Sequence, residues 1–139
     1  MRLGLGLGSL VCLAASAAFA ESAIDIERSV YVERAAEGVR ALEPATTLKK
    51  GDKVVLVVEW RADSPDRRFT VQSSVPRALA FQRAGSDAVE VSIDGGRNWG
   101  ELGQLKAGSR LASAEDVTHL RLRVAGTPAG RMTYSAIVR

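Results

Sequence analysis

Short segments in which apolar and polar side chains alternate recur along most of this chain, and they constrain its fold more than any other feature. In the clearest example, residues 117–124, Leu120, Leu122 and Val124 alternate with polar residues. Successive side chains of a β-strand point to opposite faces, so this pattern predicts a strand with one buried side. The same period appears in residues 24–32, 69–75, 89–94 and 132–138.

The segment Val54–Arg61 differs because it begins with a run of apolar residues and then places Trp60 between two polar ones. A strand that is apolar on both sides is typical of the centre of a two-layer core. Turn-forming residues separate it from its neighbours: Lys50-Gly51-Asp52 before it and Ser64-Pro65-Asp66 after it. We therefore expect a central strand here, with Trp60 pointing inward.

Two segments depart from this regular pattern. Arg28 interrupts the alternation of residues 24–32, which predicts either a bulge or a strand that crosses between sheets. Residues 34–48 contain Gly38 and Pro44 and are interpreted as a loop that holds at most one short strand.

Together these segments predict an all-β, antiparallel β-sandwich of about seven or eight short strands. A small β-barrel is the alternative architecture. The 139 residues contain no internal repeat and no break in composition, so one folded domain is expected.

The N-terminus has the three parts of a secretory signal peptide: the basic residue Arg2, an apolar run to Phe19, and the small-x-small sequence Ala18-Phe19-Ala20. We interpret residues 1–20 as a signal peptide and residues 21–139 as the mature domain, periplasmic or secreted and without a stable membrane span after cleavage. A membrane anchor or a lipoprotein attached at Cys12 are the alternatives. Cys12 is the chain's one cysteine, so residues 21–139 contain no disulfide.

Two motifs suggest a family. The sequence Leu48-Lys49-Lys50-Gly51-Asp52-Lys53-Val54-Val55 is followed by Ser74-Val75-Pro76-Arg77-Ala78-Leu79-Ala80-Phe81. Together they resemble the immunoglobulin-like conserved repeat domain of unknown function found in bacterial surface and secreted proteins. In that family a Gly-Asp turn starts a central strand, and a Pro-x-x-Leu-x-Phe segment follows about two strands later. The resemblance implies an immunoglobulin-like form of the predicted sandwich.

A second motif, Ser92 to Trp99, resembles the Asp-box of sialidases, Ser-x-Asp-x-Gly-x-Thr-Trp, with Asn98 in place of Thr. We expect a structural hairpin in which Asp94 accepts backbone hydrogen bonds and Trp99 packs over the turn. The residues assigned to this hairpin are Ser92, Asp94, Gly95, Gly96 and Trp99. If Trp99 is buried, its replacement by Ala lowers stability by about 3–5 kcal/mol.

Sialidase activity is rejected, because a sialidase requires a propeller of several blades and this chain of 139 residues is long enough for about one. The spacing of Asp94, Asn98 and Glu101 does not match an EF-hand, and no metal site is assigned. A weak calcium site of another kind remains an alternative.

Catalytic motifs are missing from the sequence. His119 is the single histidine, and the chain has no Gly-x-Ser-x-Gly or His-Glu-x-x-His motif. We therefore predict a protein that is not an enzyme and has no cofactor. The net charge of +3 is too small to indicate a nucleic-acid partner.

Two functions remain. The first is a structural or protein-binding role in the cell envelope, with a strand edge pairing with a partner protein. The second is binding of an anionic envelope component, a glycan or lipid headgroup, by His119, Arg121 and Arg123. Further arginines considered for that patch are Arg77, Arg83 and Arg110.

Overall fold

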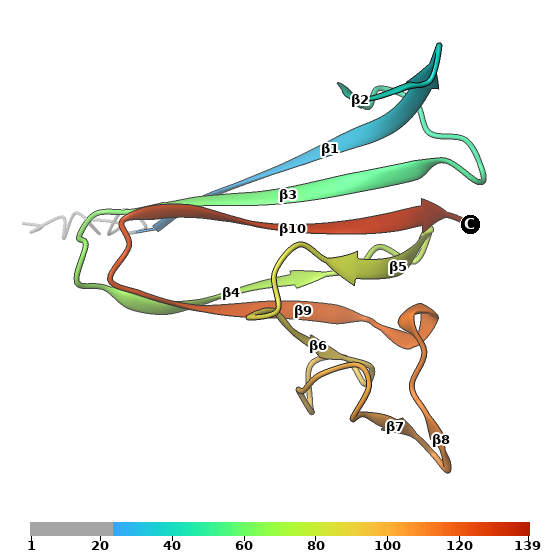
Figure 1. The fold of residues 1–139 in the computed structure, drawn as a ribbon. Coiled ribbons are helices and arrows are strands. Elements are labelled where there is room, and N and C mark those ends of the chain that lie inside the picture. Colours follow the sequence, from blue (N-terminus) through green and yellow to red (C-terminus); the bar gives the residue numbers. More distant parts are fainter. Residues whose placement is uncertain (1–23) are drawn as a thin grey trace, which may run out of the picture.

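The computed structural model describes residues 24–139. The signal peptide predicted at residues 1–20 lies outside the described residues. Within them, all regular structure is β-strand except a single turn of 3-10 helix, and every strand pairing is antiparallel. The prediction of an all-β, antiparallel fold is confirmed, and the strands form a sandwich-like pair of layers (Figure 1).

The larger layer is a five-stranded sheet in the order β2-β1-β3-β10-β5. Its strands are β1 (Ile24–Ala36), β2 (Val39–Pro44), β3 (Lys53–Ala62), β5 (Leu79–Ala84) and β10 (Ala129–Val138). The segment Val54–Arg61, which begins with a run of apolar residues, lies within β3, and β3 is at the centre of this sheet as predicted.

The smaller layer is a three-stranded sheet in the order β4-β9-β6. Its strands are β4 (Arg68–Ser74), β6 (Glu90–Ser92) and β9 (His119–Ala125). Between β6 and β9 the chain forms a small ribbon of β7 (Lys106–Ala107) and β8 (Arg110–Leu111), then the 3-10 turn η1 (Ala114–Asp116). With these short elements the described residues hold ten strands, more than the seven or eight expected.

The core lies between the two layers and is built from alternate residues of each strand. Val54, Val58 and Trp60 point inward from β3, and Leu120 and Val124 from β9. The ring of Trp60 meets that of Phe69 edge-on, with centroids 6.3 Å apart. On β10 the predicted inward set is also confirmed: Met132, Tyr134 and Ala136 are buried and Val138 is half-buried.

The chain crosses between the layers at one end of the molecule, once from β3 to β4 and once from β9 to β10 (Figure 1). The two crossings are joined there by a hydrogen bond of 2.6 Å from the Ala62 N–H to the Pro128 carbonyl. In an immunoglobulin sandwich the last two strands share a sheet. Here β9 and β10 lie in different sheets, so the immunoglobulin-like topology is not confirmed.

Strand β1 runs through Arg28 without the expected bulge. It pairs with β3 in one unbroken register from Ile24 opposite Ala62 to Val32 opposite Val54. The prediction of a bulge or a crossing strand at Arg28 is therefore wrong. Arg28 lies opposite Val58, on the inward side of the sheet, and is tolerated there because it remains exposed.

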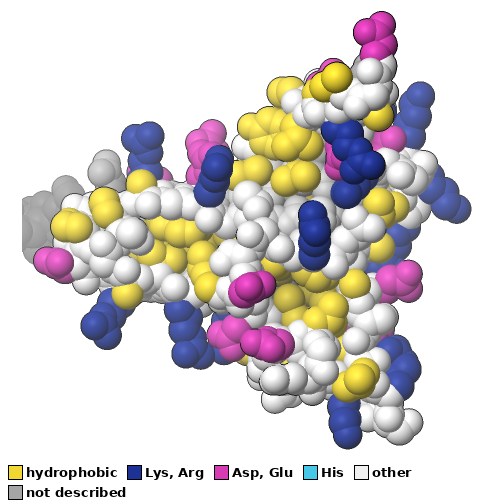
Figure 2. All heavy atoms as spheres, viewed as in Figure 1, with side chains coloured by type: hydrophobic (Ala, Val, Ile, Leu, Met, Phe, Trp, Pro, Cys, Tyr) yellow, Lys and Arg dark blue, Asp and Glu magenta, His cyan; other side chains and the backbone are white. Residues whose placement is uncertain are grey.

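The hairpin of β1 and β2 extends away from the sandwich as an arm (Figure 1). All residues of β2 are exposed, and its strand contacts are with β1. Hydrophobic side chains gather on this arm at the molecular surface (Figure 2). The six-residue strand β2 lies within residues 34–48, where the sequence predicted a loop with at most one short strand.

Candidate functional site

Asp94 organises the loop that follows β6. Its Oδ1 accepts hydrogen bonds from the Ser92 hydroxyl at 2.8 Å and from the backbone N–H groups of Arg97 and Asn98 at 3.1 and 2.9 Å. Its Oδ2 accepts one from the side-chain amide of Asn98 at 2.6 Å. The bonds from Asn98, reinforced by Ser92, hold the pKa of Asp94 well below its usual range because they favour the charged carboxylate.

The loop also covers Ser92, which is fully buried although it lies on the outward side of β6. The Ser92 hydroxyl accepts a bond from the Gly96 N–H at 2.9 Å, and Gly95 and Gly96 have φ values of 78° and 90°. Glycine tolerates this left-handed backbone best. Two backbone hydrogen bonds between Val91 and Gly100 close the hairpin at its base. All the hydrogen bonds that Asp94 accepts come from residues of this same loop and of β6.

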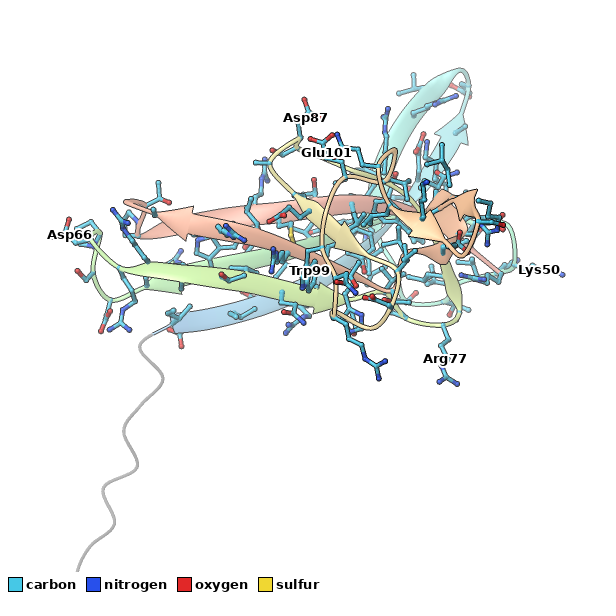
Figure 3. The ribbon with its side chains drawn as sticks, turned by 90° about the horizontal axis from the view of Figure 1, so that it is seen from below. Lys50, Asp66, Arg77, Asp87, Trp99 and Glu101 are labelled. Atoms are coloured by element: carbon cyan, nitrogen blue, oxygen red, sulfur yellow. The ribbon has the colours of Figure 1, made fainter. Side chains whose placement is uncertain are left out.

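Trp99 lies on the outer surface of the three-stranded sheet rather than in the core (Figure 3). Its ring is half-buried and stacks on the guanidinium of Arg121, whose Cζ is 4.6 Å from the ring centroid. It also lies against Gly96, where an added Cβ would come within 3.3 Å of the ring. This stacking attaches the loop to β9.

The structure places His119, Arg121 and Arg123 on the same outward face of β9, where they face Ser74, Gln72 and Thr70 of β4. Arg121 donates to both carboxylate oxygens of Glu90, at 3.1 and 3.4 Å. Such a bidentate pair neutralises the arginine's charge.

The other two members of this face are placed differently. Arg123 is 3.7 Å from the same Glu90 carboxylate, and its side chain is 72% exposed. The His119 Nδ1 is 3.0 Å from the Thr118 hydroxyl. The predicted basic stripe therefore exists as a row of residues, but one acidic side chain offsets much of its charge.

The three further arginines do not join this row. Arg110 forms an ion pair with Asp116 at 2.7 Å, and this pair lowers the pKa of Asp116. Arg83 lies on β5 in the other sheet. Arg77 projects from the connection between β4 and β5 (Figure 3).

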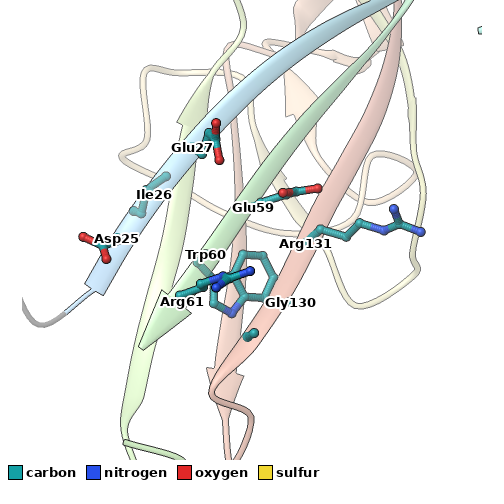
Figure 4. A pocket seen from close by; sticks show the side chains of 9 residues that line it. Asp25, Ile26, Glu27, Glu59, Trp60, Arg61, Gly130 and Arg131 are labelled. Atoms are coloured by element: carbon teal, nitrogen blue, oxygen red, sulfur yellow. The ribbon is translucent and has the colours of Figure 1, made fainter. Parts of the chain in front are cut away.

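An open depression of about 490 Å³ lies along β1, β3 and β10 (Figure 4). Glu27 on β1 lies opposite Glu59 on the neighbouring strand β3. Arg131 on β10 lies opposite Glu59 on its other side. Among the described residues, no ion pair joins these three side chains. No group of three or more His, Cys, Asp or Glu residues that could hold a metal ion occurs in this part of the chain either.

Comparison of the chain with protein-family models, curated proteins and solved structures finds no match. Within residues 24–139 no helix has the length and hydrophobicity needed to cross a membrane.

Proposed function

We propose that this chain is an exported, non-catalytic β-sandwich module that binds a protein of the cell envelope by strand pairing at β2. Export is inferred from the signal-peptide pattern of residues 1–20. The envelope setting is inferred from that pattern and from the similarity of residues 48–81 to the immunoglobulin-like repeat. The single observation that supports strand pairing is the exposed arm formed by β1 and β2.

Strand β2 contributes nothing to the core between the layers. Each of its residues is exposed, including Val39 at 66% and Leu42 at 53%. Ordering a strand has a substantial entropic cost, which burial normally offsets. Strand β2 is also the outermost strand of its sheet, so one side of its backbone is free to pair. An ordered strand with a free edge and exposed apolar side chains is suited to binding another strand.

Ion pairs hold the base of the arm in place. Glu33 on β1 is 3.4 Å from Arg40 on β2 and 3.5 Å from Lys53 on β3. Arg34 is 3.6 Å from Asp52 in the turn before β3. Exposed pairs of this kind add little stability individually, but together they favour one orientation of the arm. Binding to an ordered edge loses less conformational entropy than binding to a flexible one.

The alternative partner, an anionic envelope component held by the β9 row, is supported less well. The Glu90 carboxylate pairs with Arg121 and lies near Arg123, so an incoming anion would compete with it. This competition favours the protein partner over the anionic one.

Site-specific crosslinking tests the proposal. Residues 21–139 contain no cysteine, so Leu42→Cys introduces a single thiol on β2 that can carry a thiol-attached photo-crosslinker. The matched control is Gln82→Cys, at an exposed position of β5. After incubation with bacterial envelope extract and illumination, we expect one discrete adduct with an envelope protein from the β2 variant and none from the control.

A third variant, Val39→Lys with Leu42→Lys, places charges on the edge that oppose strand pairing. It should compete poorly with the labelled protein for its partner, while its melting temperature stays close to that of the wild type because both positions are exposed. Equal adducts from both cysteine variants would contradict the proposal. So would an adduct containing only a second copy of this chain.

A further inference from the structure

A separate groove of about 320 Å³ opens between the two layers, on the side of the molecule away from β5 and β6. On this side β4 is the edge of the smaller sheet, and the first part of β1 is an edge because β2 pairs only with residues 31–36. The side chains that matter here are Arg28, Val30, Leu56, Val58, Ser73 and Tyr134.

Tyr134 is one of the residues that line this groove. The residue is 1% exposed, and its hydroxyl is shielded from solvent. Burial raises the pKa of Tyr134 to about 12, while the side chain of Ser73 and the positive charge of Arg28 act in the opposite direction. The groove therefore offers a ligand the apolar ring of Tyr134 and not its hydroxyl.

Arg28 supplies a free positive charge at the same place. It lies opposite Val58 on the inward side of β1, remains exposed, and forms no ion pair among the described residues. A guanidinium beside an apolar groove favours a ligand that carries an anionic group, above all a carboxylate that it can bind through two hydrogen bonds.

The remaining wall of the groove is apolar. Val30, Leu56 and Val58 come from the two neighbouring strands β1 and β3 and present their side chains on the same face. At about 30 Å³ for each non-hydrogen atom, the volume corresponds to roughly ten such atoms. This is the size of a short aliphatic chain with one head group.

We propose that this groove binds a small amphiphilic carboxylate of the size of a medium-chain fatty acid. Its carboxylate accepts hydrogen bonds from Arg28, and its aliphatic chain packs against Val30, Leu56 and Val58. The site is distinct from β2, so it adds a ligand to the protein-binding role proposed above and does not depend on it.

Titration of residues 21–139 with octanoate, followed by calorimetry and by NMR of the methyl groups, tests the proposal. We expect saturable binding with shifts at the methyl groups of Val30, Leu56 and Val58. Octanol has the same chain without the charge and should bind about tenfold more weakly, the effect of roughly one charged hydrogen bond. Octyltrimethylammonium, with the opposite charge, should not compete with octanoate.

Two variants assign the contacts. Arg28→Gln should weaken octanoate binding about tenfold, in line with one charged hydrogen bond. Tyr134→Phe should leave octanoate binding unchanged, since the hydroxyl is shielded from the groove. The matched control Arg131→Gln removes another exposed arginine, outside the groove, and should leave octanoate binding unchanged.

Several results would overturn the proposal: no octanoate binding, equal binding of octanol, or equal loss in the Arg28 and Arg131 variants. Shifts confined to backbone amides of β1 and β4, with none at the methyl groups of the groove, would place octanoate outside the groove and would also overturn the proposal. The Val39→Lys, Leu42→Lys variant should bind octanoate normally, so failure here and failure of the β2 proposal are distinguishable.

Discussion

Asp94 is the residue on which the loop after β6 depends most. Its carboxylate accepts bonds from the backbone and side chain of Asn98, from Ser92 and from the backbone of Arg97. A loop with few apolar contacts of its own is held by such local bonds, which need the charged form of the carboxylate. Its stability should therefore depend on pH.

We predict that Asp94→Asn lowers the melting temperature at neutral pH, and that the difference from the wild type narrows in acid. The folded-state pKa of Asp94 is lowered from its ordinary 3.8, so the unfolded state binds the proton more readily. The stabilisation is complete above the unfolded pKa and is lost as the pH falls through and below it, from about pH 5 to about pH 2.

Melting curves of the two proteins across that range measure this effect. Asp87→Asn is the control, because Asp87 is exposed and makes no hydrogen bond through its carboxylate among the described residues. A difference between wild type and Asp94→Asn that stays constant down to the lowest pH would contradict the prediction.

Trp99 contributes by stacking and not by filling the core, so the loss of about 3–5 kcal/mol expected for a buried ring no longer applies. Its half-buried ring rests on Arg121. We predict that Trp99→Ala destabilises the fold by about 1–2 kcal/mol, from partial loss of apolar burial and of the cation–π contact. A double-mutant cycle with Arg121→Ala should show a coupling of about 0.5–1 kcal/mol. Strictly additive effects in urea denaturation would show that the stacking contributes nothing.

At the scale of the elements, the sequence predicted the strands whose alternation directly reflects burial. The strands β3, β4, β9 and β10 fall close to the predicted segments, because each has one face against the core. Strand β2 could not be predicted in this way, since it has no buried face and hence no alternation. Its pairing with β1 is a hairpin closed by the two-residue turn Glu37-Gly38, both with positive φ, so Gly38 is the local signal for it.

The candidate sites show the same limit. The spacing of Ser92, Asp94 and Trp99 indicated the hairpin, because its hydrogen bonds are local in sequence. The burial of Ser92 and the pairing of Arg121 with Glu90 were missed, since they depend on which strands become neighbours. Arg28 did leave a signal, a break in the alternation, but its cause was the edge position of β1 and not a bulge.

The close packing of β10 against β3 depends on a glycine. A Cβ added at Gly130 would lie 2.6 Å from the ring of buried Trp60, so the ring would have to move. We predict that Gly130→Ala lowers the free energy of unfolding by about 1–3 kcal/mol, as overpacking of a core usually does. The matched control is Gly103→Ala, where nothing lies within 4 Å of the added atom and stability should change by less than about 0.5 kcal/mol. Urea denaturation of both variants measures the difference, and equal effects would contradict this account.

At the scale of the whole molecule, the two sheets cannot form independent units. The chain passes from one sheet to the other four times, after β3, β4, β5 and β9, and a single buried cluster contains residues from both layers. Neither sheet can bury its apolar face without the other. The two layers should therefore unfold together, as a single cooperative transition.

Leu120→Ala tests this coupling because Leu120 is completely buried on β9, the central strand of the smaller sheet, and belongs to the shared cluster. We predict a loss of about 2–5 kcal/mol in the free energy of unfolding, the range for a buried leucine. The unfolding midpoints measured by far-ultraviolet circular dichroism and by the fluorescence of Trp60, in the opposite layer, should shift together to lower urea concentration. A Trp99→Phe background leaves Trp60 as the only source of tryptophan fluorescence in residues 24–139. Leu111→Ala is the matched control, since Leu111 is 59% exposed and its loss should change stability by less than about 0.5 kcal/mol. Separate midpoints for the two signals would show that the sheets unfold independently, because a substitution in one layer would then leave the fluorescence of the other unchanged.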